Sequence, residues 1–372
     1  MKVPDTSKWR GWWKGWYGLI PARFIGKTDP LVGLDIGSRA IKLVQLEQRD
    51  QGYRLHRCGL KRLYPGMLDG ERSPNKSALV SAIKELFEEC GVRVTRVAIS
   101  ISGPSVIIKR IRIPMMAMEE VEQYLVWNSQ QYIPYDSDEL YLDFHVVPQV
   151  NPGRKSTQLD LFLVAAKKDL VEQRRKLVEN AGLDPVVCEV DSLALTNMYI
   201  LTDCPNSHQT VLLVNIGASG MNMAVVRGEN PVLMRDASTG GDRYNDRIRS
   251  TLHCSEKRAD QVLFSQVEEM DFLPLLAEVH EEIGGEVKRT IEYLAETELG
   301  GTMDKVLLCG GYARAPGLVE SLSRFLGLPV EHIDPFHGVE VDESGVDRDA
   351  LYNLAPLAAV GMGLASRRAG DR

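Results

Sequence analysis

Two short segments of this chain, about half a chain apart, carry the same order of residue types. In each, an apolar run delivers a small polar residue, then a glycine and a hydroxyl residue, and a second β-rich run follows at once. Each segment therefore predicts a hairpin whose glycine lets backbone N–H groups approach a phosphate group closely. The residues that carry this order are Asp35, Gly37 and Ser38 in the first segment and Asn215, Gly217 and Ser219 in the second.

A third segment has the chemistry of a nucleotide contact. An apolar strand at residues 305–309 ends in Gly310 and Gly311, and the sequence Ala-Pro-Gly at residues 315–317 opens a helix behind it. A single strand that ends in glycine is usually no more than a strand end. Three such segments in this order favour a site where backbone groups surround a nucleotide.

The ordered set of motifs resembles the actin-like ATPase superfamily (actin, sugar kinases, Hsp70 and FtsA), and more closely its PilM family of type IV pilus assembly proteins. The Asp-Ile-Gly-Ser segment at 35–38 is followed by Lys42, and a Gly-Gly-Asp segment lies at 240–242. A helix of small residues spans 354–363 near the C-terminus. The resemblance extends from about residue 30 to the end of the chain. It implies a duplicated α/β actin-like (ribonuclease H-like) ATPase fold, with an α+β insert subdomain of the FtsA and PilM type.

The resemblance also implies that ATP and Mg²⁺ bind between the two actin-like domains, with Asp35 holding the metal through water. Lys288 and Arg289 resemble the adenosine-contacting helix of Hsp70-like members, but they equally fit a solvated helix face that forms Glu-to-Lys pairs. The residues expected at the cofactor are Asp35, Gly37, Ser38, Lys42, Asn215, Gly217, Ser219, Gly240, Gly241, Lys288, Arg289, Gly310 and Gly311.

The sequence departs from an efficient hydrolase at Asn215, where the family pattern has an aspartate, because an amide brings no negative charge to the metal. Glu189 is the first candidate to polarise the attacking water. Asp191 is the alternate, and its other interpretation is a helix cap. No two histidines lie at the spacing of a metal-binding pair, and the sequence shows no recognisable Ser-His-Asp catalytic triad. We expect ATP to be a structural or switching ligand with slow hydrolysis. A genuine ATPase or small-molecule kinase, or an FtsA-like membrane-tethered filament scaffold, remains the alternative. A type II secretion GspL-like protein fits less well, since its membrane span is missing.

Composition and the positions of turn-forming residues predict how the chain is divided into domains. Its 372 residues are 44% apolar and 26% charged, which is ordinary for a globular protein of more than one core. No apolar run is long enough to span a bilayer, and the six scattered cysteines indicate a reducing, cytoplasmic compartment. The expected units are an N-terminal extension (1–29), the first actin-like domain (30–104 and 183–207), an inserted α+β subdomain for protein contacts (105–182), the second actin-like domain (208–350) and a C-terminal helix that packs back on the first domain (351–372).

The first 28 residues differ in character from the rest. They hold six basic residues and one acid, net +5, whereas the remainder of the chain carries −12. At helical spacing their apolar residues fall on one face, which is typical of an interfacial helix on anionic lipid. A tail that packs on the body or stays disordered is the other interpretation. The tryptophans of this face are Trp9, Trp12, Trp13 and Trp16.

The resemblance implies partners as well as a ligand. They are the cytoplasmic N-terminal peptide of a PilN-like inner-membrane protein and, through it, other pilus motor components. We expect the peptide between the first domain and the insert, against residues 106–113 and the helix that bears Tyr124, Trp127 and Tyr132, although a core role for Trp127 is an equal alternative. A homo-oligomer or ring is a further expectation, and nothing indicates a nucleic-acid partner. The protein is expected to be cytoplasmic and peripheral to the inner membrane.

Overall fold

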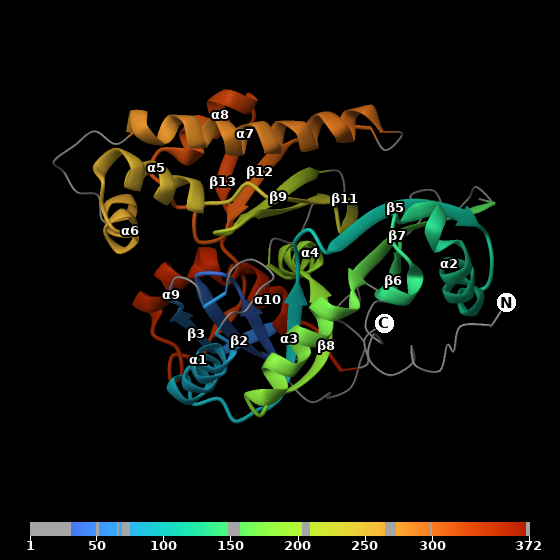
Figure 1. The fold of residues 1–372 in the computed structure, drawn as a ribbon, viewed down its shortest axis with the longest axis horizontal. Coiled ribbons are helices and arrows are strands. Elements are labelled where there is room, and N and C mark those ends of the chain that lie inside the picture. The colour runs from blue at the N-terminus through green and yellow to red at the C-terminus, as the bar shows by residue number, and fades with distance from the viewer. Residues whose placement is uncertain are drawn as a thin grey trace.

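The computed structural model describes residues 31–49, 52–64, 67–68, 75–147, 157–202, 209–264, 273–297 and 300–369. Within them the chain forms two large mixed sheets that lie one above the other, with a smaller sheet set to one side (Figure 1). The interfacial helix predicted within the first 28 residues, with its four tryptophans, lies outside the described residues. None of the helices in the described part combines the length and apolar composition that a membrane crossing requires.

The first sheet has the strand order β14-β3-β2-β1-β4-β8. Its antiparallel β1, β2 and β3 follow one another along the chain, whereas β4 and β8 run parallel to β1. The hairpin predicted around Gly37 is confirmed as β1 and β2, whose central residues are almost entirely buried, whereas β3 is mostly half-buried. The strands are β1 (Val32–Ile36), β2 (Ala40–Gln48), β3 (Tyr53–Arg62), β4 (Arg96–Ile101), β8 (Asp184–Val190) and β14 (Glu340–Val341).

The second sheet repeats this plan with the order β11-β10-β9-β12-β13. Again three consecutive antiparallel strands are followed by parallel ones, since β12 pairs with β9 and β13 in parallel. The strands are β9 (Thr210–Ile216), β10 (Met221–Arg227), β11 (Asn230–Ala237), β12 (Lys305–Cys309) and β13 (Val330–His332). The repeated plan places the tips of the β1–β2 and β9–β10 hairpins at equivalent points of the two sheets.

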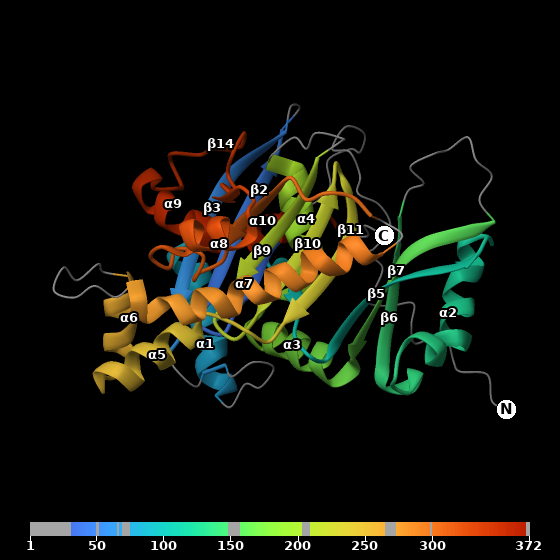
Figure 2. The ribbon, with the colours of Figure 1, turned by 90° about the horizontal axis from the view of Figure 1, so that it is seen from above.

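The insert forms a sheet of its own, in the order β5-β7-β6, with one helix packed on it. It lies beside the two large sheets, with β5 next to β11 of the second sheet (Figure 2). Its core is separate, being built from residues such as Ile113, Leu125 and Phe144. The elements are β5 (Val106–Pro114), α2 (Met118–Tyr132), a short 3-10 turn (Ser137–Glu139), β6 (Leu140–Val146) and β7 (Gln158–Lys167).

Helices cover the outer faces of the two large sheets and fill the space between them. Helix α1 shows how the sequence sets them: Asn75 caps it by accepting a hydrogen bond from the Ala78 N–H, and Leu79, Ile83 and Leu86 face the core. All of these helices lie outside the insert. They are α1 (Lys76–Glu89), α3 (Lys168–Asn180), α4 (Asp191–Thr202), α5 (Asp242–Leu252), α6 (Glu256–Phe264), α7 (Leu273–Glu296), α8 (Leu318–Leu326), α9 (Arg348–Leu354), a 3-10 turn (Ala355–Leu357) and α10 (Ala359–Ala365).

The C-terminal helix α10 packs on β1 and α4 at backbone distance. A Cβ atom added to Gly33 of β1 would lie 2.1 Å from the carbonyl oxygen of Gly361, and one added to Gly363 would lie 1.7 Å from that of Ala194. Only small residues permit such an approach, which explains the Gly- and Ala-rich composition of this segment. We expected the chain to return to the first domain at residue 351. It returns earlier, because β14 at residues 340–341 already pairs with β3 of the first sheet.

Candidate functional site

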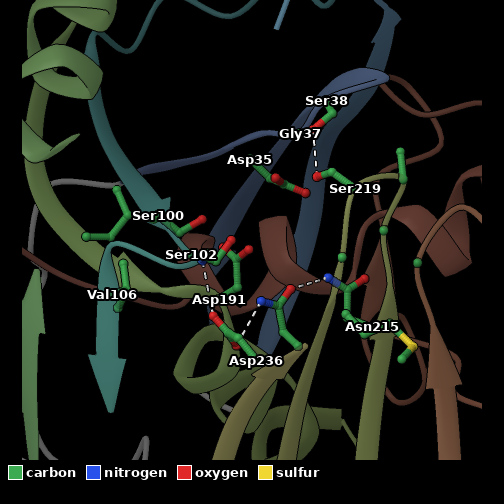
Figure 3. A pocket seen from close by; sticks show the side chains of 18 of the residues that line it. Asp35, Gly37, Ser38, Ser100, Ser102, Val106, Asp191, Asn215, Ser219 and Asp236 are labelled. Atoms are coloured by element: carbon green, nitrogen blue, oxygen red, sulfur yellow. Dashed lines mark hydrogen bonds between the residues drawn. The ribbon is translucent and has the colours of Figure 1, made fainter. Parts of the chain in front are cut away.

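The tips of the β1–β2 and β9–β10 hairpins meet face to face, although they lie far apart in the sequence (Figure 3). The hydroxyl oxygens of Ser38 and Ser219 are 3.1 Å apart. Each hairpin closes in the same way: the Gly37 N–H donates to Ala40 O at 3.1 Å, and the Gly217 N–H donates to Gly220 O at 2.9 Å. The two predicted halves of a phosphate clamp are thus brought together.

Asp35 and Lys42 lie opposite each other in the β1–β2 register, next to this meeting point. The Nζ atom of Lys42 is 3.0 Å from an Asp35 carboxylate oxygen, and both side chains are mostly buried. A Cβ atom added to Gly37 would come within 2.8 Å of the same Nζ atom. Glycine at this turn therefore leaves room for the lysine ammonium to reach the hairpin tip.

The hairpins open onto a cavity of about 920 Å³ between the two large sheets. This volume is in the upper part of the range of ordinary small-molecule sites. Among the residues that sequence reasoning proposed, the cavity is lined by Asp35, Gly37, Ser38, Lys42, Asp191, Asn215, Gly217, Ser219, Gly310 and Gly311. Five others do not line it: Glu189, Gly240, Gly241, Lys288 and Arg289.

Of the two candidate carboxylates at the β8–α4 junction, Asp191 faces the cavity and Glu189 does not. Glu189 is 1% exposed, lies 3.1 Å from the Arg367 guanidinium and accepts a hydrogen bond from Asn197. Its charge is therefore engaged between β8, α4 and the C-terminal segment. The geometry favours the alternate candidate, Asp191, as the group that could orient water.

The environment of Asp191 adjusts its acidity. Burial raises the pKa of this carboxyl to about 6, the negative charge of Asp35 adds to the rise, and hydrogen bonds from Ser100 and Ser102 oppose it. The guanidinium of Arg174 lies nearby and donates to Ile36 O at 3.0 Å. Burial lowers the pKa of Arg174, and the charges of Asp191 and Asp35 oppose that change. Carboxylates and one arginine thus share the floor of the cavity.

The glycines of the Gly-Gly-Asp segment support the second hairpin. The Gly241 N–H donates to Gly217 O at 2.8 Å and the Asp242 N–H to Ala218 O at 2.9 Å. A Cβ atom at Gly240 would lie 2.3 Å from Ala218 O, and one at Gly241 would overlap the ring of Tyr312. Their close packing, and not a contact with the cavity, explains why this segment is glycine.

Asp242 also ties the two halves of the molecule together. Arg39, at the tip of the first hairpin, donates to one Asp242 carboxylate oxygen through Nε at 3.0 Å and through Nη2 at 2.7 Å. Arg39 pairs with Glu256 of α6 as well, and the Tyr312 hydroxyl lies 3.4 Å from the same Asp242 oxygen. This Arg39 cluster, which comprises Arg39, Asp242 and Glu256, links the first hairpin to the second half of the molecule beside the cavity that Arg39 lines.

The Gly310-Gly311 turn follows β12 and brings backbone to the cavity wall. Gly310 has a φ of 94°, which a residue with a Cβ atom rarely adopts. Added at this position, a Cβ atom would lie 2.5 Å from Ile216 O. Apart from its two chain neighbours, the only atom of the described residues within 4 Å of a Cβ atom on Gly311 would be Leu357 Cδ2, at 3.8 Å. Gly311 therefore has room beside it on the cavity side.

Lys288 and Arg289 occupy the exposed face of α7. Their side chains are 54% and 59% exposed; Lys288 lies 3.8 Å from Glu292, and Arg289 pairs with Glu286. Glu286 also binds Arg235 of β11 at 2.9 Å. This arrangement matches the alternative of a solvated helix face with pairs along the helix, and an adenosine contact by these residues stays a prediction.

Several cavity residues were not found from the sequence: Arg39, Ser100, Ser102, Arg174, Asn222 and Asp236. Ser100 lies near the end of β4 and Ser102 follows directly after it. Because β4 runs parallel to β8, and carboxyl ends of adjacent parallel strands share one edge of a sheet, both serines lie at the edge where β8 ends. That rule, applied to the Ser-x-Ser-Gly-Pro sequence at 100–104, is a signal that could have found them. Asn222 and Asp236 depend on sheet register, which the sequence alone leaves open.

The cavity combines groups that suit a phosphate chain with a divalent cation. Lys42 and the glycine turns supply donors, and Asp35 and Asp191 supply carboxylate oxygens, the ligands that Mg²⁺ prefers. Within the described residues no three His, Cys, Asp or Glu side chains form a ready-made metal cluster. The donor set therefore fits a cation held through water and phosphate oxygens better than one held by the protein alone.

The family model for type IV pilus assembly protein PilM matches residues 33–369, which is nearly the whole described chain. The chain belongs to the PilM family. Its structure is similar to that of a PilM-PilN type IV pilus biogenesis complex, with a TM-score of 0.81 and 26% identity over 91% of this chain and 98% of that one. The family and this match give the chain a role in type IV pilus assembly.

More distant relatives agree on the fold. Cell division protein FtsA of Enterococcus hirae is 20% identical over 91% of this chain and 88% of its own. The ethanolamine utilization protein EutJ from Carboxydothermus hydrogenoformans is 17% identical, with a TM-score of 0.54 and 91% of both chains covered. The predicted duplicated actin-like fold is thereby confirmed for this PilM family member.

Proposed function

We propose that this PilM family member binds Mg·ATP in the cavity between its two sheets and uses the nucleotide as a structural or switching ligand within the pilus assembly platform. The observation that carries the proposal is the convergence of the two glycine hairpin tips and the Gly310-Gly311 turn on one cavity that also holds Asp35, Lys42 and Asp191. Phosphate binding through hairpin amides needs these parts at one place.

In this proposal each side chain has a distinct task. The turns at Gly37 and Gly217 donate backbone N–H groups to phosphate oxygens, and Lys42 neutralises their charge. Asp35 and Asp191 would hold Mg²⁺ through water, and the ion when bound would screen the phosphate charge. Asp191, whose pKa is about 6, is mostly ionised at neutral pH and can accept a proton from a water molecule.

Turnover is expected to be slow because of Asn215. Its amide Nδ2 donates to Asn222 Oδ1 at 3.0 Å, so it is already engaged within the sheet, and it carries no charge for the metal. We therefore expect turnover below about 1 s⁻¹, the low end of ordinary enzymes.

Thermal unfolding with and without Mg·ATP tests binding. At a ligand concentration about 100 times the Kd, the free energy of unfolding should rise by about 2.7 kcal/mol. Lys42→Ala should lose most of this gain, whereas Lys84→Ala on the exposed face of α1 should keep it. No stabilisation of the unmodified protein would remove the proposal, and phosphate release above about 1 s⁻¹ would favour the alternative of a genuine ATPase.

We propose that the partner is the cytoplasmic peptide of a PilN-like inner-membrane protein and that it binds beside the insert. The similar solved structure is a complex of a PilM with PilN, which supports a partner of this kind. Among the candidate residues, Trp127 is 74% exposed on α2, so the described structure leaves it available to a partner and not in a core. The edge strand β5 offers backbone groups for strand addition.

Titration of the full chain with such a peptide tests this site. Peptide binding should slow amide exchange across residues 104–135, and Trp127→Ala should weaken peptide binding. Tyr352→Ala, which alters another exposed aromatic residue far along the chain, should leave peptide binding unchanged. Binding with unaltered exchange over 104–135 would move the site elsewhere.

We further propose that the tail at residues 1–28 attaches the protein to the cytoplasmic face of the inner membrane, where other motor components and further copies of the chain in a ring would meet it. Its net charge of +5 complements anionic lipid, at about 1 kcal/mol for each basic residue near the surface. Deletion of residues 1–28 should abolish sedimentation with anionic liposomes and leave the melting temperature unchanged. A lower melting temperature with intact lipid binding would assign the tail to the folded body.

A further inference from the structure

A row of polar side chains crosses the second sheet directly beneath the cavity. In the β9–β10 register Asn215 lies opposite Asn222, and in the β10–β11 register Asn222 lies opposite Asp236. Asn215 Nδ2 donates to Asn222 Oδ1 at 3.0 Å, and Asn222 Nδ2 donates to Asp236 Oδ1 at 3.0 Å (Figure 3). Three strands are thus linked side chain to side chain, starting from the second phosphate hairpin.

The row continues into the other half of the molecule. The second carboxylate oxygen of Asp236 accepts a hydrogen bond from the Gly103 N–H at 3.2 Å. Gly103 lies between β4 of the first sheet and β5 of the insert and has a φ of 104°, so it is the turn at which the insert begins. Arg110 of β5 adds a second tie to the same strand by donating to Val232 O of β11 at 3.0 Å.

The residue types in this row give it a direction. Each amide uses its NH₂ group toward the next acceptor, and Asp236 ends the row because a carboxylate can accept from both sides. Asn222 and Asp236 are among the cavity-lining residues, yet Asn222 is only 8% exposed. Burial raises the pKa of Asp236, and its bonds from Asn222 and Gly103 oppose the rise. A shift of the Asn215 side chain therefore changes the hydrogen-bond donor that Asn222 meets, and through Asn222 the donor that Asp236 meets.

We propose that Asn215, Asn222 and Asp236 couple occupancy of the cavity to the position of the insert through the Gly103 turn. The inference rests on the proposed binding of Mg·ATP. A phosphate or hydrated cation that contacts the Asn215 amide changes the bond to Asn222, and the change reaches Gly103 through Asp236. Asn222 and Asp236 are positioning residues in this coupling, since they connect Asn215 at the second hairpin to the Gly103 turn of the insert.

Hydrogen exchange of the full chain, read by mass spectrometry with and without Mg·ATP, tests the coupling. Asp236→Asn is the informative variant because it keeps the shape but offers one acceptor oxygen to two donors. Exchange at Gly103 should then be about fivefold faster without nucleotide, the factor expected for one ordinary hydrogen bond. The control is Glu229→Gln, an acid-to-amide change at an exposed turn residue just before β11.

In the unmodified protein and in Glu229→Gln, Mg·ATP should change exchange both at residues 215–222 and at residues 101–110. In Asp236→Asn the change at 215–222 should persist while that at 101–110 disappears. A response at 215–222 alone in the unmodified protein would overturn the coupling and leave the proposed nucleotide site intact. No response at either segment would overturn both. If Asp236→Asn fails to fold, Asn222→Ala interrupts the same row and the same outcomes apply.

Discussion

Replacing Asp191 by asparagine is expected to stabilise the protein at neutral pH while weakening any hydrolysis. The carboxyl lies among Ser100, Ser102 and Asp35 at the cavity floor, and its pKa rises from an ordinary value of 3.8 to about 6. Asparagine has nearly the same shape and no charge. The substitution therefore removes the cost of holding a buried negative charge, to which the neighbouring Asp35 adds, and keeps the packing of the β8–α4 junction.

The size and pH range of the effect follow from the same pKa. Between about pH 4 and pH 6 the folded protein holds a proton on Asp191 that the unfolded chain has released, so the free energy of unfolding falls as the pH rises through this range. Two pKa units correspond to about 3 kcal/mol, and partial access to solvent at the cavity lowers this to about 1–3 kcal/mol. Above about pH 6 the charge on Asp191 lowers the free energy of unfolding by this full amount, and below about pH 4 it does not lower it at all.

Thermal melting at pH 4.5, 6 and 8 checks this. At pH 8, Asp191→Asn should melt about 2–12 °C higher than the unmodified protein, given about 2–4 °C per kcal/mol for a domain of this size. The difference should shrink at the lowest pH. The control Asp184→Asn, at the exposed start of β8, should show neither effect. Equal melting temperatures at pH 8, with the same pH dependence in both proteins, would refute the assignment of a strained charge to Asp191.

Three further substitutions are informative. Gly363→Ala places a Cβ atom 1.7 Å from Ala194 O and should lower the free energy of unfolding, measured by urea titration, by about 1–3 kcal/mol. The control Gly285→Ala on α7 has no contact nearer than 4.0 Å among the described residues and should raise the free energy of unfolding by up to about 1 kcal/mol. Equal effects of the two substitutions would contradict the packing of α10. Arg39→Ala removes the cation between Asp242 and Glu256, so the backbone amides at 217–220 and 240–242 should exchange faster. The control is Arg49→Ala, at an exposed arginine, which should leave that exchange unchanged. Unchanged amide exchange in Arg39→Ala would mean that the Arg39 cluster does not hold the two halves of the molecule together. Asn215→Asp should raise phosphate release with Mg·ATP and lower the melting temperature without it, because a carboxylate cannot donate to Asn222; a drop in release would reverse the reasoning about the metal.

Local patterns predicted the fold well because each strand and helix carries its own signal. The two glycine hairpins were found because the order of residue types in each segment specifies a strand, a tight turn and a second strand, and tertiary contacts did not override it. The short strands β13 and β14 were missed, since two or three residues carry no period.

The candidate site was only partly predictable. The hairpin and Gly-Gly residues follow from motifs, but the choice between Glu189 and Asp191 depends on which way the chain turns at the end of β8. The row from Asn215 to Asp236 requires the register of three strands. Gly240 and Gly241 were assigned to the ligand, whereas the described structure uses them for contacts with the hairpin and Tyr312, because a glycine motif does not say which neighbour approaches it.

The contact between β1 and α10 has a consequence for how the protein is made. Residues 32–36 leave the ribosome long before the helix that covers them, at residues 359–365, has been synthesised. The first sheet must therefore wait with an uncovered apolar face while the second sheet and its helices, which lie between these segments in the sequence, can already assemble. Such long-range closure is slow, and it exposes the nascent chain to aggregation. Expression of this protein should depend on chaperones more than that of a chain whose N-terminal domain is finished early, and a stop codon before residue 359 should yield insoluble product and not a smaller folded protein.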